Sequence, residues 1–281
     1  MPRNEVMRHM LVRQNIGLIT VRQVAEGIFN HVMTTNCIVD NRATLSNKGY
    51  ALLLPLYLYP EKTKTSLFDS YLDANHTRDR RPNLALAFTT EISSKLNMQF
   101  IQDDKGDLQE TFGPEDIFNY MYAVFYSPTY RTRYAEFLKI DFPRLPLTSD
   151  TELFRWLCKL GERLVGLHLM EKLGKSTPNY PEQGNNVVEK IEYREPVNQS
   201  EQGRVYINKT QYFDSIPPEV WAFHVGGYQV CYKWLKDRKG RALSYDDIKH
   251  YQRIIAALAE TITLMEKIDE MIEEHGGWPI E

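Results

Sequence analysis

The sequence has little of what would place it in a membrane, outside the cell or on a disulfide framework. Its longest apolar run, Tyr50–Pro60, is too short to cross a bilayer and is interrupted by Pro55. The N-terminal MPRNEVMRHM has no hydrophobic signal core, so we expect a cytoplasmic protein. Only three cysteines occur, and an odd, scattered set predicts neither a disulfide framework nor a zinc site. They are Cys37, Cys158 and Cys231.

Signatures of catalysis are also missing. The chain has no Gly-x-Ser-x-Gly elbow, and its seven histidines form no HxxxH ligand pair. Residues 174–177 (GKST) resemble the end of a phosphate-binding loop, but the first glycine of that motif would fall at Leu169. Residues 216–219 (IPPE) contain the two prolines of an adenine-methyltransferase loop. Ile216 offers no polar group to the adenine amine, however, and Glu219 offers no ring to stack on a flipped base. The sequence therefore predicts no catalytic residue and no metal ligand.

One enzymatic alternative stays open. Glu219, Asp237 and Lys239 can be drawn as a metal-dependent nuclease signature, in which carboxylates hold Mg²⁺ and the lysine lies near the attacking water. The carboxylates of such nucleases normally lie on adjacent strands, whereas residues 221–236 have a helical pattern. Cleavage of DNA by the isolated chain would favour this alternative.

The 281 residues, 42% hydrophobic and 25% charged, are typical of a globular protein, and their periodicity predicts an α+β fold. We expect a single domain, 1–281, with a strand-rich N-terminal lobe at 1–112 and a mainly helical part at 113–281. The elements predicted in the lobe are a helix at 4–11, strands at 15–22, 31–40 and 50–59, a polar loop at 61–81 and a helix from Pro82 to Leu96.

The helical part has clear start signals. Pro114 and its acidic neighbours suit a first turn, Ser127-Pro128 ends that helix and caps the next, and Asp150 caps a third that reaches Gly174. The second of these helices should carry Tyr130, Tyr134, Phe137 and Leu138 on one face, and the third should turn Leu153, Trp156, Leu160, Leu164 and Leu167 inward. Beyond them we expect a strand pair at 187–193 and 204–213, a helix at 217–235, and a long last helix with a capping box at Ser244 and Asp247. Its apolar seam is Ile248, Tyr251, Ile255, Leu258, Ile262 and Met265.

Three basic clusters stand out against a formal net charge of −3. A nucleic-acid binder is usually basic overall, but binding depends on local clusters rather than on the sum. In an interhelical turn, several cations can lie on successive phosphates, whereas an arginine in a polar loop can read a guanine edge in a bidentate way. The candidate DNA-binding residues are Lys233, Lys236, Arg238, Lys239 and Arg241 in the turn, Arg78, Arg80 and Arg81 in the polar loop, and Arg131 and Arg133 near a helix N-terminus. Solvation of a turn or loop is the alternative for the first two clusters, and an ion pair with Glu136 for the third.

Several long stretches resemble the C-terminal specificity domain of Type ISP restriction-modification enzymes. In the family's order, they are PRNEVMRHML (2–11), NIGLI (15–19), LLPLYLYP (53–60), the segment from Glu115 to Leu147, the segment from Val220 to Arg241, and the segment from Ser244 to Ile262. The segment 117–146 is also similar to recognition regions of other fused methyltransferase-restriction enzymes.

The resemblance implies a target-recognition domain that clamps duplex DNA together with a methyltransferase domain while an adenine is flipped. In that family S-adenosylmethionine, ATP and Mg²⁺ are bound by upstream domains, so we expect no cofactor in this chain. Its partners would be double-stranded DNA and the methyltransferase and helicase-nuclease domains of the parent polypeptide. Residue 1 falls within what resembles a continuing segment of that polypeptide.

The expected function is sequence-specific recognition of duplex DNA without catalysis by the chain itself. Phosphate contacts from the basic clusters would position the domain, and side chains on the loops at 61–81 and 194–204 would read base edges in the major groove. Besides the nuclease, a protein-interaction module that docks its C-terminal helix on a partner remains an alternative.

Overall fold

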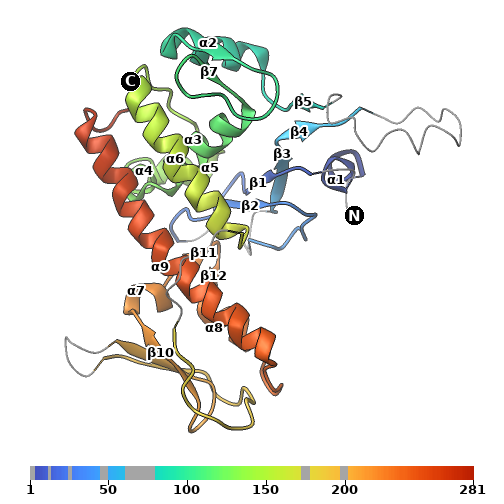
Figure 1. The fold of residues 1–281 in the computed structure, drawn as a ribbon, viewed down its shortest axis with the longest axis vertical. Helices are drawn as coiled ribbons and strands as arrows, with labels where there is room; N and C mark the ends of the chain where they lie inside the picture. The colour runs from blue at the N-terminus through green and yellow to red at the C-terminus, as the bar shows by residue number, and fades with distance from the viewer. Residues whose placement is uncertain are drawn as a thin grey trace, which may run out of the picture.

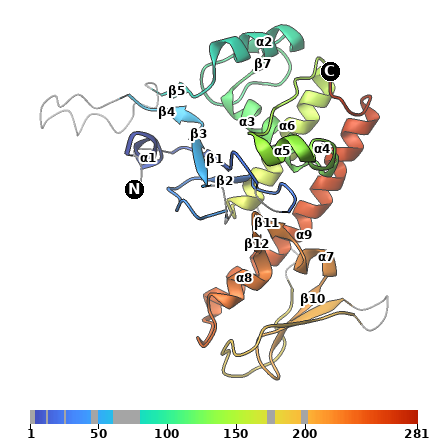
Figure 2. The ribbon, with the colours of Figure 1, turned by 180° about the vertical axis from the view of Figure 1, so that it is seen from behind.

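The computed structural model describes residues 4–11, 14–24, 27–44, 50–60, 80–171, 178–196 and 202–281. Figure 1 and Figure 2 show small sheets at the N-terminal side and at one end, with helices packed between them. The α+β class predicted from the sequence is confirmed. In the described residues, no helix is long and apolar enough to cross a membrane.

The N-terminal elements build one three-stranded antiparallel sheet and two short pairs. Helix α1 (Asn4–Leu11) precedes β1 (Gly17–Thr20), which lies between β2 (Met33–Thr35) and β3 (Leu52–Pro55). Strand β4 (Tyr57–Leu58) pairs antiparallel with β5 (Arg81–Pro82), and β6 (Gln99–Phe100) pairs parallel with β7 (Thr111–Phe112). The predicted helix at 4–11 and strands within 15–22, 31–40 and 50–59 are confirmed.

The predicted helix start at Pro82 is wrong, because α2 comprises Leu86–Leu96. Pro82 pairs with Tyr57 in the β4–β5 ladder, and the next residue extends this connection. The Asn83 backbone N–H donates to the Leu56 carbonyl at 2.8 Å, and its side-chain amide donates to the Pro55 carbonyl at 3.0 Å. An edge strand tolerates proline, so Arg81 and Pro82 form a strand rather than the start of a helix.

The four helices of the middle region are α3 (Pro114–Tyr126), α4 (Pro128–Arg133), α5 (Ala135–Ile140) and α6 (Thr151–His168). Three of them, α3, α4 and α6, begin where the sequence predicts, whereas α5 follows Tyr134 without a side-chain cap. The Ser127 side chain accepts from the Tyr130 N–H, and the Asp150 carboxylate accepts from the backbone at the start of α6.

Three details of these helices differ from the prediction. The single helix expected after Ser127 breaks at Tyr134 into α4 and α5, which leaves Phe137 70% exposed instead of on a buried face. Trp156, predicted to face inward, is 42% exposed, whereas Leu153, Leu164 and Leu167 are buried as expected. The predicted helix end at Gly174 is also wrong: α6 ends at His168, because Met170 turns the chain at φ +60°, and residues 169–171 are not helical.

The C-terminal region contains a second antiparallel sheet, in the order β10–β9–β8, and a long helix. Its elements are β8 (Glu192–Arg194), β9 (Gly203–Tyr206), β10 (Tyr212–Ile216), α7 (Pro218–Trp221), β11 (His224–Val225), β12 (Tyr228–Gln229), α8 (Val230–Lys236) and α9 (Tyr245–Glu274). The capping box of Ser244 and Asp247 at the start of α9 is confirmed.

Two predicted elements of this region are each divided by a turn. The strand expected at 204–213 is a hairpin, because the Asn208 carboxamide oxygen accepts from the backbone of Thr210 and Gln211 and reverses the chain. The helix expected at 217–235 is divided by the β11–β12 hairpin. Gly226 turns it at φ +58°, and a Cβ there would lie 2.2 Å from the Thr44 carbonyl oxygen, so only glycine fits.

Helix α9 joins two hydrophobic cores. The first core contains residues of β1, α3 and α6 together with Leu264, Ile268 and Ile272 of α9. The second contains residues of β9, β10 and α8 together with Tyr251, Ile255 and Leu258 of α9. Both views show α9 passing from the helical region to the end that carries β10 (Figures 1 and 2). The domain organisation proposed for 1–112 and 113–281 stays a prediction; residues on both sides of position 112 share the first core.

A buried polar chain crosses the first core. The Thr261 hydroxyl donates to the Ala257 carbonyl at 2.8 Å, so it accepts from His168 Nε2 at 2.9 Å. His168 Nδ1 then accepts from the Tyr122 hydroxyl at 2.6 Å. This pattern requires a neutral imidazole, and burial together with the Arg131 charge lowers the pKa of His168 to about 3.

Candidate nucleic-acid interface

The basic cluster at 233–241 lies on α8 and on the turn between α8 and α9. Lys233 pairs with Asp237 one helical turn later, and the Arg238 guanidinium lies 3.5 Å from the centre of the Trp234 ring. Arg238 Nε also lies 3.3 Å from Asp247 in the first turn of α9. Lys236, Lys239 and Arg241 are exposed, and no described carboxylate pairs with them. We define these three as the exposed cations of the turn.

Backbone hydrogen bonds fix this turn to the neighbouring chain. Gly240, at φ +80°, donates to the Val188 carbonyl at 2.8 Å, and the Val188 N–H donates to the Arg241 carbonyl at 3.0 Å. The Leu243 N–H donates to the Asn186 carbonyl at 2.9 Å. The exposed cations therefore project from a rigid turn, which suits contact with phosphates at fixed spacing.

Aromatic rings accompany the cations along the same segment. Each ring has a cation within 6 Å of its centre, in the pairs Tyr228–Lys233, Tyr232–Lys236, Trp234–Arg238 and Tyr245–Lys249. Such contacts hold long flexible side chains close to the surface.

The polar-loop cluster divides between a structural and an exposed arginine. Arg78 lies outside the described residues, as does most of the loop 61–81. Arg80 Nε donates to Asp103 at 2.6 Å, and its guanidinium lies 3.7 Å from the centre of the Tyr57 ring, so Arg80 is largely buried in internal contacts. Arg81, on β5, is exposed.

The third cluster has one buried and one exposed member. Arg131 and Arg133 lie in the last turn of α4, so the argument from a helix N-terminus is wrong for them. Arg131 is only 7% exposed; its Nε donates to the Phe125 carbonyl at 2.7 Å, and its guanidinium lies over the Tyr126 ring. Arg133 is exposed, and the ion pair considered for it is absent, because Glu136 pairs instead with Lys139 at 2.7 Å.

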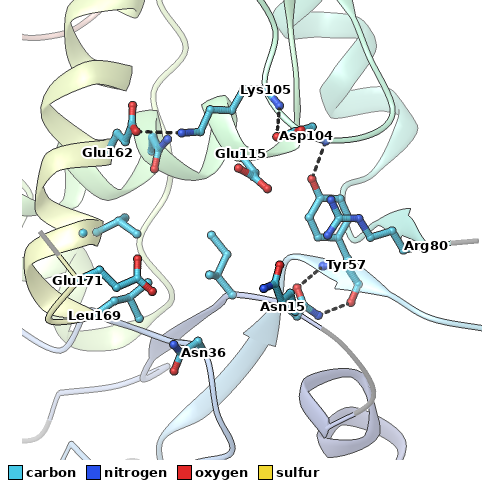
Figure 3. Close-up of a pocket in the computed structure, with 15 residues that line it drawn as sticks. Asn15, Asn36, Tyr57, Arg80, Asp104, Lys105, Glu115, Glu162, Leu169 and Glu171 are labelled. Carbon is cyan, nitrogen blue, oxygen red and sulfur yellow. Dashed lines mark hydrogen bonds and ion pairs between the residues drawn. The ribbon is translucent and has the colours of Figure 1, made fainter. Parts of the chain in front are cut away.

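A polar cavity of about 690 Å³, which the sequence analysis did not predict, lies between α3, α6 and the N-terminal strands. Figure 3 shows Lys105 facing Glu162, at 3.0 Å, while the Asp104 N–H donates to the Tyr57 hydroxyl at 3.0 Å. Asn15 holds the backbone of Tyr57 through both of its amide atoms. A partial signal existed in the charged DDK sequence at 103–105, but nothing local connects it with Glu162.

The charge of this cavity does not suit phosphate. Its charged lining groups are four carboxylates and two cations, namely Asp104, Glu115, Glu162, Glu171, Arg80 and Lys105. Burial raises the pKa of Glu115, and the negative charge of Asp104 adds to the effect. The cavity is thus acidic, and the turn at 236–241 remains the better candidate for DNA.

The residues of the nuclease alternative do not form a metal centre in the described structure. Glu219 is exposed on α7, and Asp237 at the end of α8 is paired with Lys233. Within the described ranges, no three His, Cys, Asp or Glu side chains gather where they could hold a metal ion.

Comparison with known protein families gave one match over nearly the whole chain. Residues 1–267 match the family described as the Type ISP C-terminal specificity domain. A comparison with curated proteins found no match.

Three solved structures share the fold at low sequence identity. The ATP-dependent Type ISP restriction-modification enzyme LlaBIII bound to DNA has a TM-score of 0.59 and 19% identity, over 96% of this chain and 16% of that chain. A nuclease-deletion mutant of the Type ISP enzyme LlaGI, in complex with a DNA substrate mimic, has a TM-score of 0.55 and 18% identity, over 96% and 22%. The DrdV–DNA complex has a TM-score of 0.58 and 20% identity, over 94% and 25%. The chain therefore spans a quarter or less of the length of each of these proteins.

Proposed function

Because the chain belongs to the family of Type ISP C-terminal specificity domains, we propose that it recognises a duplex DNA target for a larger restriction-modification enzyme. The family match carries this proposal. It is supported by the similar folds, which come from enzymes whose structures were solved with DNA or a DNA mimic.

Phosphate contacts would come from the exposed cations of the turn. Lys236, Lys239 and Arg241 project from a backbone fixed to residues 186–188, and Arg81 and Arg133 are further exposed cations of the predicted set. A local surface of this kind is compatible with the net charge of −3, because phosphate binding depends on nearby charges. We leave Arg131 out of the interface, since its guanidinium is buried, and we assign Arg80 to the support of Tyr57.

Base reading and chemistry would be divided between this chain and its partners. In the proposal, side chains around 61–81 and 194–204 read base edges, although residues 61–79 and 197–201 lie outside the described structure. Methyl transfer, translocation and cleavage would belong to upstream domains of the parent polypeptide, acting in the cytoplasm. S-adenosylmethionine, ATP and Mg²⁺ would be bound there, and this chain would have no catalytic role of its own.

The test is the salt dependence of duplex binding. Each lost phosphate contact lowers the slope of log K against log salt by about 0.9, so replacing Lys236, Lys239 and Arg241 with glutamine should lower it by roughly 2.7. The control replaces three exposed lysines of other surfaces, Lys95, Lys159 and Lys267, with glutamine and changes the net charge equally. An unchanged slope in the first variant, or an equal loss in both, would exclude this turn as the phosphate-binding surface.

The alternatives predict other results. A nuclease built on Glu219, Asp237 and Lys239 would nick duplex DNA with Mg²⁺ and lose that activity in Glu219→Ala, whereas we expect neither nicks nor methyl transfer from the isolated chain. An interaction module that does not touch DNA would show no salt-sensitive duplex binding.

A further inference from the structure

The outward face of the β8–β9–β10 sheet carries an ordered set of polar side chains. Val205 and Phe213 are fully buried in the second core, so the residues that alternate with them face outward. These outward residues are Glu192 and Arg194 on β8, Arg204 and Tyr206 on β9, and Tyr212 and Asp214 on β10.

Two arginines lie directly opposite each other on this face. Arg194 and Arg204 are partners in the β8–β9 register, and their side chains are 55% and 46% exposed. Like charges at opposed positions of neighbouring strands lower the stability of a sheet. The direct opposition of the two arginines is therefore unfavourable for the sheet by itself.

Each guanidinium is held flat by a ring and a carboxylate. Arg194 Cζ lies 4.0 Å from the centre of the Tyr206 ring, and its Nε donates to Glu192 at 2.9 Å. Arg204 repeats this arrangement, with Cζ 4.9 Å from the centre of the Tyr212 ring and Nε 3.0 Å from Asp214. The two rings are themselves in contact, with centres 4.9 Å apart.

In each pair the carboxylate binds Nε of the guanidinium rather than its terminal nitrogens. Both carboxylates accept from Nε, and no described carboxylate accepts a hydrogen bond from the terminal nitrogens. A guanidinium fixed in a plane, whose terminal N–H groups are not taken up by a described carboxylate, matches the paired O6 and N7 acceptors of guanine in the major groove. Holding the side chain in advance lowers the conformational entropy lost on binding.

We propose that Arg194 and Arg204 read guanines of the DNA target in the major groove, and that Tyr206 and Tyr212 position them. This inference rests on the proposed function and places base reading on the sheet face at the two ends of the 194–204 loop. The rigid sheet, rather than the loop between its strands, sets the spacing of the two readers.

The experiment is a selection of duplexes from a pool with a randomised segment, using the 281-residue chain and sequencing of the bound DNA. Arg194→Lys and Arg204→Lys keep the charge but remove the planar fork. Each should lower the preference for guanine at one position by about 5- to 150-fold, with the salt slope unchanged. The matched control is Arg22→Lys, an exposed arginine whose Nε also donates to a carboxylate, Asp141 at 3.2 Å, on another surface.

Each outcome separates the inference from the proposed function. Unchanged base preferences in both variants would overturn the inference and leave the proposed function intact. An equal loss of affinity for all sequences would do the same, because it indicates contacts with phosphates rather than with bases. Binding by the wild-type chain without any base preference would also overturn it, while no duplex binding at all would overturn the proposed function as well. Thermal unfolding of each variant excludes loss of the fold as the cause.

Discussion

Two histidines of the interior, His31 buried and His168 half-buried, should make the stability of the protein fall as the pH drops below about 6.5. Burial, followed by the charge of Arg131, lowers the pKa of His168 to about 3 and that of His31 to about 4. In the unfolded chain both would titrate near 6.5. Between these values only the unfolded chain binds the protons, so the contribution is complete above about pH 6.5 and is lost as the pH falls.

The size of the effect follows from these pKa values. At about pH 5, each histidine lowers the free energy of unfolding by about 2 kcal/mol relative to pH 7.5, so the pair lowers it by about 4 kcal/mol. Urea unfolding across this range measures the change. If the free energy of unfolding is the same at these two pH values, the conclusion that both imidazoles are neutral in the folded protein is wrong.

A substitution isolates one of the two groups. His168→Gln keeps one donor and one acceptor for Thr261 and Tyr122 but cannot titrate. It should remove about half of the pH-dependent loss, on the order of 2 kcal/mol at pH 5. Carboxylates titrate alike in both proteins, so the difference between them reports His168 alone. His224→Gln, on the exposed β11–β12 hairpin, should leave the loss unchanged.

Two further substitutions test the packing and the interface. A Cβ at Gly161 of α6 would lie 1.9 Å from the Asn119 carbonyl oxygen of α3, so Gly161→Ala should lower the free energy of unfolding in urea by about 1–3 kcal/mol or more, despite the roughly 1 kcal/mol by which alanine favours helix; an unchanged value would contradict the close approach of the two helices. Arg131→Met should leave the DNA affinity and its salt slope unchanged in a binding titration, because the side chain is buried; a slope lowered by about 0.9 would return Arg131 to the interface.

Local chemistry was sufficient for the elements whose ends are set within one turn of the chain. Ser127, Asp150 and Ser244 each bond to backbone N–H groups two or three residues later, so the sequence alone could place those helix starts. The α8–α9 turn and its basic residues were identified for the same reason.

The elements that could not be predicted from the sequence depend on contacts between residues far apart in the chain. The hairpin at Gly226 depends on the backbone of Thr44, and the strand at Pro82 depends on β4. In the interface, an arginine looks the same in the sequence whether it is buried like Arg131 or held on a ring like Arg238. Local residues therefore predicted where basic side chains gather, while the tertiary structure determines which of them reach solvent.

The long helix α9 has a thermodynamic consequence for the whole chain. Its 30 residues extend about 45 Å, and Tyr251 lies in one core while Ile268 lies in the other. If either core unfolded, one half of α9 would lose its apolar partners. Only the other core would then stabilise the helix. The free energies of unfolding of the two cores are therefore coupled through α9. A substitution that destabilises one core lowers the cooperative stability of both.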